Sequence, residues 1–178
     1  DTFQADYVPA PYIAKTETKQ DDRVTAALDH RERLIVFTRD TVQRITGSDP
    51  STFASTLVND KVGCLAPLSV AGVDNYLTWV GRDGIYLART VEGIQDYLDV
   101  VRISDPIQPT FDALTDEANA VAIHHGGQYK VHFPADGKSL RWYKPGVIKA
   151  RSGVWTAPDV STLQFARFVQ RRDGKLYA

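Results

Sequence analysis

The stretch of residues 76–89 constrains the fold most strongly, because it reads as two β-strands joined by a tight turn. β-Branched and aromatic residues alternate on both sides of Arg82-Asp83-Gly84. An Asp-Gly pair between two such runs is a strong signal for a β-hairpin. Similar runs start at positions 33, 128 and 175, so the hairpin is a repeated unit.

The spacing of the repeat indicates the class of fold. Leu34, Leu77, Tyr129 and Leu176 occupy corresponding positions and are separated by 43, 52 and 47 residues. A repeat of about 40 to 50 residues made of short strands and tight turns is typical of a β-propeller blade. A small sheet leaves apolar faces that a neighbouring sheet must cover, so blades pack side by side. The alternative is an ordinary meander of a β-sandwich, whose hairpins also look alike.

We therefore predict an all-β fold of β-propeller-like repeats, with about three blades and the start of a fourth. Residues 1–22, in which Pro9 and Pro11 favour extended backbone, form an extended arm, and residues 23–178 form a partial β-propeller domain. The blades occupy about residues 23–62, 66–104 and 119–157, and the next one starts near residue 162. Because about four to eight blades close a propeller, we interpret the chain as a fragment of a larger protein, completed by other segments or subunits.

One short helix is predicted between the second and third blades. Ser104-Asp105-Pro106 suits the start of a helix, and Ile107, Phe111 and Leu114 are spaced to share one helical face. This insertion, over about residues 105–117, accounts for the longer 52-residue step. Because the insertion and the arm both stand outside the repeat, we expect them to contact other subunits.

Charge and composition exclude some classes of protein. The formal net charge is −1, with basic and acidic residues interspersed, so the sequence shows no duplex-binding surface. The single cysteine, Cys64, has no partner for an internal disulfide and is typical of a small buried residue. No apolar run approaches the about 18 residues of a membrane-spanning helix, so we expect no membrane partner.

The histidines are the first candidates for metal binding. His124 and His125 are adjacent, and His132 follows shortly after them. If the flanking strands pair as a hairpin, His125 lies at the turn, and His124 and His132 approach each other across the strands. A metal site needs three or four converging ligands, and we see no matching set. We therefore expect a solvated turn, no metal and no cofactor.

Hydrolase chemistry finds little support in the sequence. No Gly-x-Ser-x-Gly nucleophile elbow is present. Sialidase-like propellers carry Ser-x-Asp-x-Gly turns, whereas residues 135–139 place Asp136 and Gly137 side by side. A pair of carboxylates across a propeller axis stays open, but we predict that the protein is not an enzyme and has no catalytic residues.

The repeated Arg-Asp pairs have two interpretations. Arg39, Arg82 and Arg172 each precede an Asp in a predicted turn, where Asp accepts backbone N–H bonds and Arg stays solvated. Alternatively, the repeated turns place the arginines around a rim that binds phosphate or a neighbouring subunit. We favour the first interpretation and keep the second as a hypothesis.

Four stretches, taken in order, carry a resemblance to a known family. They are Arg-Leu-Ile-Val-Phe-Thr-Arg-Asp-Thr-Val from residue 33, Val-Gly-Cys-Leu-Ala-Pro-Leu-Ser-Val from residue 62, Gly-Arg-Asp-Gly-Ile-Tyr from residue 81 and Ile-Ser-Asp-Pro-Ile-Gln-Pro from residue 103. This order resembles the β-propeller-type structural proteins of tailed bacteriophages, including nozzle and hub components at the neck or tail tip. The later stretches Tyr-Lys-Val-His-Phe-Pro from residue 129, Gly-Val-Trp-Thr from residue 153 and Asp-Gly-Lys-Leu-Tyr from residue 173 continue the pattern, so the resemblance covers about residues 22–178. It rests on packing and turn motifs, which indicate fold better than function.

The resemblance implies a structural virion protein, assembled in the bacterial cytoplasm, that contributes to a ring or channel of the neck or tail. Its partners would be other virion subunits and further copies in a homo-oligomeric ring, with passing contact to DNA. No catalytic residue is carried over from the family. The candidate interaction residues are Ile107, Phe111, Leu114, Arg39, Arg82 and Arg172.

A carbohydrate- or receptor-binding propeller is the second hypothesis, with a glycoside hydrolase behind it. It would use aromatic residues and turn carboxylates on one face. Trp79, Trp142 and Trp155 are the candidates for stacking on sugar rings, but such residues more often pack between blades. We therefore place the architectural role first.

Overall fold

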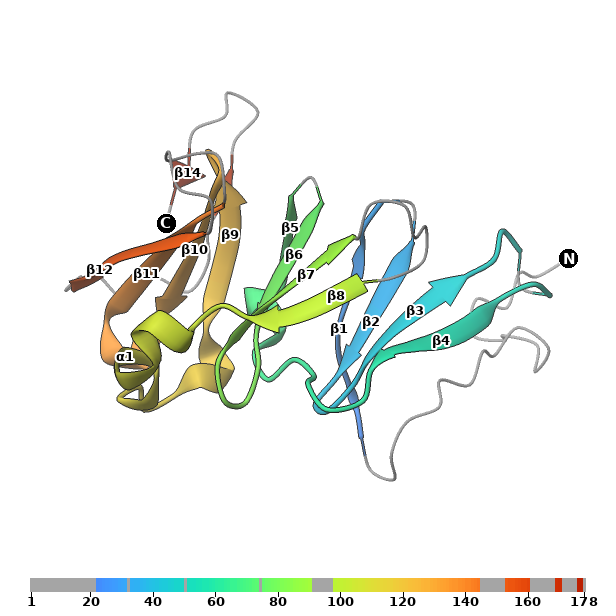
Figure 1. Ribbon diagram of the computed structural model, residues 1–178, viewed down its shortest axis with the longest axis horizontal. Helices are drawn as coiled ribbons and strands as arrows, with labels where there is room; N and C mark the ends of the chain where they lie inside the picture. Colours follow the sequence, from blue (N-terminus) through green and yellow to red (C-terminus); the bar gives the residue numbers. More distant parts are fainter. Residues whose placement is uncertain are drawn as a thin grey trace, which may run out of the picture.

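The computed structural model describes residues 22–31, 33–49, 51–73, 75–90, 98–144, 153–160, 169–170 and 176–177. These residues are mostly β, in three four-stranded antiparallel sheets that follow one another along the chain. The sheets lie side by side in sequence order, from the blue and cyan first sheet to the orange third sheet (Figure 1). The all-β prediction is confirmed, and within the described residues no sheet closes on itself.

Each sheet is a meander, because each strand pairs with the strand that follows it. The first sheet contains β1 (Val24–Asp29), β2 (Leu34–Thr38), β3 (Val42–Thr46) and β4 (Ala54–Asn59). The second contains β5 (Ala71–Val73), β6 (Tyr76–Val80), β7 (Ile85–Thr90) and β8 (Leu98–Arg102). The third contains β9 (Val121–His125), β10 (Gln128–Phe133), β11 (Lys138–Tyr143) and β12 (Val154–Val160). A further antiparallel pair joins β13 (Val169–Gln170) to β14 (Leu176–Tyr177).

The repeat seen in the sequence marks the same strand in each unit. Leu34, Leu77 and Tyr129 lie in β2, β6 and β10, the second strands of their sheets, and Leu176 lies in β14. The predicted central hairpin is confirmed: β6 pairs with β7, and the Gly81 N–H donates to the Gly84 carbonyl at 2.8 Å to close the turn.

The second sheet is buried on both faces, which explains why β6 reads as an almost continuous apolar run. Leu77 and Trp79 belong to a cluster shared with the first sheet. Val80 belongs to a cluster shared with the third sheet. Stacking of this kind buries apolar faces that a single small sheet leaves exposed to water.

The connection from the first to the second sheet closes tightly over the strand ends. The Cys64 N–H donates to the Thr38 carbonyl at 2.8 Å, and the Leu65 N–H donates to the Val80 carbonyl at 2.9 Å. Gly63 allows this approach, since a Cβ there would lie 2.3 Å from the Thr38 oxygen. Backbone hydrogen bonds thus join the two sheets directly.

The insertion between the second and third sheets has one short α-helix with a 3-10 helix on each side of it. It contains a 3-10 helix at Asp105–Ile107, α1 (Gln108–Asp112) and a second 3-10 helix at Glu117–Asn119. The prediction of one short inserted helix is confirmed, and α1 covers only part of the expected residues 105–117. Ser104 makes no side-chain cap, because its Oγ accepts the Ile85 N–H at 3.1 Å and contacts Gln108 Oε1 at 3.0 Å.

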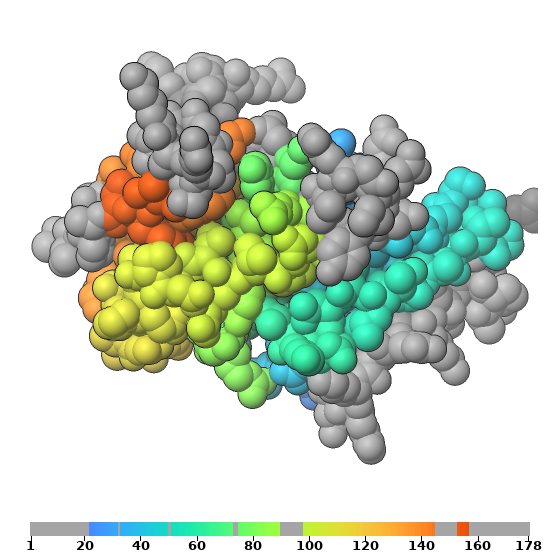
Figure 2. Space-filling model, in the orientation of Figure 1, coloured from blue at the N-terminus to red at the C-terminus, as the bar shows by residue number. Residues whose placement is uncertain are grey.

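After α1, the position of the chain is fixed by a side chain from the turn between β10 and β11. Asp136 accepts the N–H and the hydroxyl of Thr115 at 3.1 and 3.0 Å. The segment therefore leaves α1 and returns to β9 through a fixed turn. Figure 2 shows this segment in yellow beside the orange third sheet, with β4 in teal along the surface of the first sheet.

Turns and connections gather at one end of the stack, the lower edge in Figure 1. We call it the Arg-Asp end and define it by residues 39–41, 60–66, 81–84 and 134–137. It contains the β2–β3, β6–β7 and β10–β11 turns and the first connection. The predicted Arg-Asp turns that the structure describes therefore lie on one side of the molecule.

Candidate interaction surfaces

The structure brings two of the three predicted Arg-Asp pairs together. Arg39 and Asp40 lie in the β2–β3 turn, and Arg82 and Asp83 lie in the β6–β7 turn. Arg82 Nη2 is 3.3 Å from Asp40 Oδ1, which makes an ion pair between the first and second sheets. Both side chains are exposed, so the pair contributes about 0 to 1 kcal/mol. Arg172 lies outside the described residues.

A pocket of about 200 Å³ opens between these two turns and the connection that crosses them. Its lining residues are Arg39, Asp40, Lys61, Val62, Gly63, Arg82 and Asp83. Asn59 shapes the connection, because its Oδ1 accepts the N–H groups of Lys61 and Val62, both at 2.9 Å. Lys61 was missed by the sequence analysis, although an Asn two residues before it is a recognisable Asx-turn signal.

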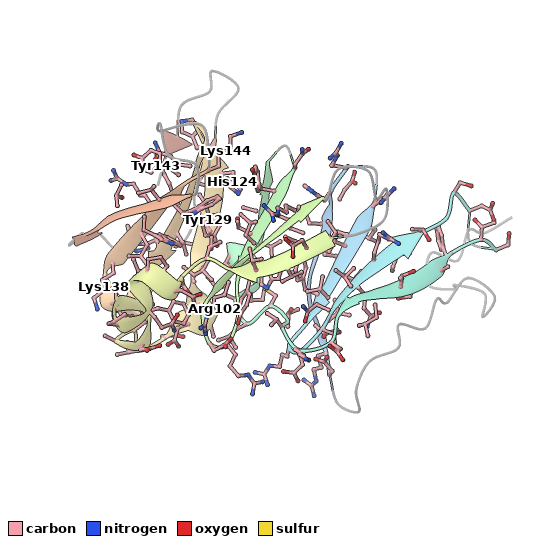
Figure 3. All side chains as sticks on the ribbon, viewed as in Figure 1. Arg102, His124, Tyr129, Lys138, Tyr143 and Lys144 are labelled. Atoms are coloured by element: carbon pink, nitrogen blue, oxygen red, sulfur yellow. The ribbon has the colours of Figure 1, made fainter. Side chains whose placement is uncertain are left out.

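Asp83 is held by groups on the second sheet. Tyr86 donates its hydroxyl to Asp83 Oδ1 at 2.6 Å, and Arg102 Nη1 lies 3.5 Å from Asp83 Oδ2. Burial, followed by the hydrogen bond to Asp83, raises the pKa of the Tyr86 phenol. Arg102 also donates to Asp105, and this hydrogen bond raises the pKa of the Arg102 guanidinium. Figure 3 shows Arg102 at the lower edge of the second sheet.

This arrangement can contact an anionic group at the pocket rim. Asp40 pairs with Arg82, and Asp83 is bonded to Tyr86 and Arg102. Within the described part of the chain, Arg39 and Lys61 carry no ion pair. A guanidinium and an ammonium at one pocket suit a carboxylate or a phosphate oxygen. Arg39 and Arg82, two of the arginines in the rim hypothesis, thus line one pocket. Binding of a phosphate or of a neighbouring subunit there stays a prediction.

The predicted contact residues of the insertion point inward. Phe111 is 2% exposed and Leu114 is 7% exposed, and Ile107 packs against the same cluster. The ring of Phe111 meets that of Phe133 edge-on, with centroids 6.3 Å apart. These three side chains therefore pack the insertion against the apolar cluster shared by the second and third sheets. Any contact between the insertion and another subunit must use its exposed residues.

The histidines do not converge. In the register of β9 and β10, His124 pairs with Tyr129, whereas His132 pairs with Val121, so the expected approach of His124 to His132 is wrong. His124 Nε2 lies 2.9 Å from the Thr78 hydroxyl on the second sheet, and His132 Nδ1 lies 2.9 Å from Ser139 Oγ. Within the described residues, no three His, Cys, Asp or Glu side chains cluster as metal ligands.

Hydrogen bonds that the sequence analysis missed join the third sheet to the second sheet and to the connection that leads into it. Tyr129 donates its hydroxyl to the Ser69 carbonyl at 2.9 Å, and both residues are fully buried. Figure 3 shows Tyr129 and His124 on the side of the third sheet that faces the second. Burial raises the pKa of the Tyr129 phenol, so this donor keeps its proton across the usual pH range. A buried tyrosine needs such a partner.

The tryptophans pack between sheets. Trp79 is fully buried, and its ring centroid lies 5.2 Å from that of Phe37 on the first sheet. Trp142 is 3% exposed, and its ring lies edge-on to Tyr76 of the second sheet at 6.3 Å. Trp155 is partly buried and donates Nε1–H to the Ile103 carbonyl at 2.6 Å. The packing interpretation is confirmed, and the rings of Trp79 and Trp142 are not available to stack on a sugar.

Cys64 is a structural residue. It is fully buried, and its thiol donates to the Ala66 carbonyl at 3.1 Å. Burial raises the pKa of this thiol to about 12. Because the thiolate is the reactive form, burial disfavours Cys64 as a nucleophile.

These features define an antiparallel β protein built from stacked four-stranded sheets, with a charged pocket at one end. The chain matches no protein-family model and no curated protein. No helix among the described residues has the length and apolar character needed to cross a membrane.

Proposed function

We propose that the chain is a structural domain of a tailed-phage virion, in a neck or tail component that forms part of a ring or channel. In this proposal the three sheets are consecutive blades of a β-propeller, and β13 and β14 begin the next. The domain has no catalytic role. Its surfaces dock other virion subunits, and DNA passes through the ring with which it associates.

The equivalence of the two inter-sheet contacts is the observation that carries the proposal. Leu77 and its cross-strand neighbour Ala88 face the first sheet, and Tyr129 and its neighbour Trp142 face the second. All four are between 0% and 3% exposed. Corresponding positions thus meet the preceding sheet twice in succession, as radially packed blades require. The phage assignment is supported by the order of motifs from residue 33 to residue 109.

The Arg-Asp end supports the docking role. Its pocket combines exposed charges of both signs on turns, a composition that suits a polar contact between subunits. Loops carried on rigid sheets are the usual location of binding residues. The pocket is therefore the expected contact site for a neighbouring subunit.

Imaging of the purified parent protein by electron microscopy tests the proposal. A ring, or density at the neck or tail of a particle, is the expected result. A soluble monomer with a complete propeller and an open central pocket would contradict the architectural role. Saturable, sugar-competable binding on a glycan array would instead favour the carbohydrate-binding alternative.

A further inference from the structure

The pocket at the Arg-Asp end has more positive than negative charge in its lining. Arg39, Lys61 and Arg82 are cationic, whereas Asp40 and Asp83 are anionic. Arg82 pairs with Asp40, and Asp83 is engaged by groups of the second sheet. Among the described residues, the charges of Arg39 and Lys61 therefore stay unbalanced.

The backbone beside Arg39 is held in place by its neighbours. The Arg39 N–H donates to Asp22 Oδ1 at 2.9 Å, and the same carboxylate accepts the hydroxyl of Thr38. The Thr38 N–H donates to the Thr41 carbonyl at 2.9 Å, which closes the β2–β3 turn. A turn that is already ordered loses little conformational freedom when its side chain binds a partner.

The segment that carries Lys61 is attached to the same turn. Asn59 Oδ1 accepts the Lys61 N–H at 2.9 Å. Two residues later, a Cβ on Gly63 would lie 2.3 Å from the backbone carbon of Arg39, so the connection passes directly against the turn. The two cationic side chains thus extend from one fixed backbone frame into one pocket.

The pocket is open to solvent and small. Arg39 and Lys61 are both exposed, and the Arg82 side chain is 67% exposed. The volume of about 200 Å³ lies below the roughly 300 to 1,000 Å³ of sites that enclose a drug-sized ligand. The size therefore suits a single side chain or a small ion.

We propose that this pocket binds the carboxylate of an Asp or Glu side chain on a neighbouring subunit. A carboxylate brings one negative charge, which balances the excess of three cationic over two anionic lining residues. Its two oxygens accept charge-assisted hydrogen bonds from the Arg39 guanidinium and the Lys61 ammonium. The inference names the partner group for the docking site of the proposed function and rests on that function.

A phosphate group matches the pocket less well. A phosphomonoester carries about −1.5 to −2 charges at pH 7, which exceeds what the lining balances, and Asp40 and Asp83 would repel the excess. A nucleic-acid backbone adds further phosphates on both sides of the one that is bound. The formal net charge of −1, with both signs interspersed along the chain, offers no extended basic surface for them.

NMR titration of the 178-residue chain with sodium acetate, at an ionic strength held constant with sodium chloride, tests the chemistry of the pocket. We expect saturable shifts of the Arg39, Lys61 and Gly63 amides. The dissociation constant should be about 5 to 100 mM, the range for one or two charge-assisted hydrogen bonds. Inorganic phosphate at the same pH should bind no more tightly than acetate.

Two variants and a matched control locate the binding. Lys61→Gln and Arg39→Gln each remove one cation from the pocket and should weaken acetate binding at least about threefold. Arg89→Gln is the control, because Arg89 is 57% exposed and pairs with Asp99 but does not line the pocket. Its acetate titration should match that of the unmodified chain, and circular dichroism checks that all three variants fold.

The outcomes of the titrations decide the chemistry. Saturable acetate shifts that weaken in both pocket variants and persist in Arg89→Gln support the proposal. An unmodified chain without saturable shifts overturns it, and so do pocket variants that bind acetate as well as the unmodified chain. Phosphate binding at least about tenfold tighter than acetate also overturns it, because the pocket is then a phosphate site.

Imaging of the parent protein separates this inference from the proposed function. If the unmodified parent forms a ring and the Lys61→Glu and Arg39→Glu parents assemble equally well, the carboxylate contact is overturned while the proposed function stands. If these two variants lose the ring, the contact is supported. A parent that forms no ring contradicts the proposed function, and the partner named here is then overturned with it, whatever the acetate titration shows.

Discussion

The two interfaces between sheets are built from equivalent strands of the repeat but are held together differently. Between the first and second sheets the contact is aromatic and aliphatic, with Phe37 and Trp79 at its centre, and the chain connection adds backbone bonds. Between the second and third sheets, side-chain hydrogen bonds from Tyr129 and His124 cross the interface. The helical insertion packs beside it through Phe111. One type of packing unit is thus adapted to two different kinds of contact.

The difference teaches where each interface is vulnerable. The first is centred on the Phe37–Trp79 contact, so truncating Trp79 should weaken the attachment of the first sheet more than a comparable truncation weakens the second interface. The second distributes its contacts among several polar and apolar groups, so a comparable truncation should leave the sheets joined. We therefore expect the first sheet to open locally at a lower free energy than the third sheet.

Trp79→Ala should have the largest effect, because it removes a fully buried ring from the first interface. We expect the free energy of unfolding to fall by about 3 to 5 kcal/mol. Urea unfolding followed by circular dichroism measures this loss. Amide hydrogen exchange should show lower protection in β1–β4 than in β9–β12. Equal loss of protection in both sheets would contradict the proposed difference between the interfaces.

Trp79→Phe is the control for this variant. It retains an aromatic ring beside Phe37 but loses the hydrogen bond from Nε1 to the Gly63 carbonyl, which is 3.0 Å long. A buried carbonyl without its donor costs about 1 to 3 kcal/mol. We expect a stability between those of the unmodified protein and Trp79→Ala. The difference between the two variants then measures the packing of the ring apart from the hydrogen bond.

Phe111→Ala tests the other interface. It removes a side chain that is 2% exposed and meets Phe133 edge-on, so we expect a loss of about 3 kcal/mol, at the lower end for a buried Phe because α1 is short and can close over the gap. The β9–β12 amides should stay protected, because the hydrogen bonds to the second sheet remain. Complete unfolding of the third sheet in hydrogen exchange would show that the insertion, and not these bonds, holds the interface.

The repeat made most of the fold predictable from sequence. Arg82-Asp83-Gly84 located the central hairpin, and the equivalent positions Leu34, Leu77 and Tyr129 located the second strand of each sheet. Alternation and turn signals act over a few residues, so they survive in the sequence. The insertion was less predictable, because the Ser104 hydroxyl bonds to the distant Ile85 N–H instead of capping the helix.

Contacts between sheets could not be derived from local pattern. Nothing near Tyr129 in the sequence indicates the Ser69 carbonyl, which is 60 residues away. The approach of Arg82 to Asp40 likewise joins turns 42 residues apart. The sequence predicted that the aromatic residues are buried. It could not predict which residue each of them contacts, because that depends on how the sheets stack. The sequence therefore predicted the turns of the Arg-Asp end but not the pocket between them.

Tyr129→Phe removes a single polar contact from the second interface. The Tyr129 hydroxyl donates to the buried Ser69 carbonyl, and the loss of such a bond costs about 1 kcal/mol while the ring stays packed. Chemical unfolding should detect this decrease with an unchanged dependence on denaturant concentration. An unchanged stability would mean that another donor reaches the Ser69 oxygen in the variant.

Acid should weaken the fold through its buried histidines. Burial lowers the pKa of His30, with a further contribution from Arg31, and burial lowers the pKa of His132. Below pH 6.5, the ordinary value for both, the unfolded chain binds more protons than the folded chain, so stability falls as the pH falls. Unfolding midpoints between pH 8 and pH 5 measure this decrease. His132→Gln should reduce the slope, and an unaltered slope would assign the effect to other groups.

Arg82→Ala should have the smallest effect, because the ion pair with Asp40 is exposed on both sides. We expect a change of less than about 0.5 kcal/mol that disappears in 0.5 M salt. The turn itself should persist, since the Gly81–Gly84 backbone bond does not involve this side chain. Asp40→Asn is the partner variant, and the double-mutant cycle isolates the pair. A loss above about 1 kcal/mol would show that the Arg-Asp end stabilises the stack itself, and would then count against a pocket reserved for contact with another subunit.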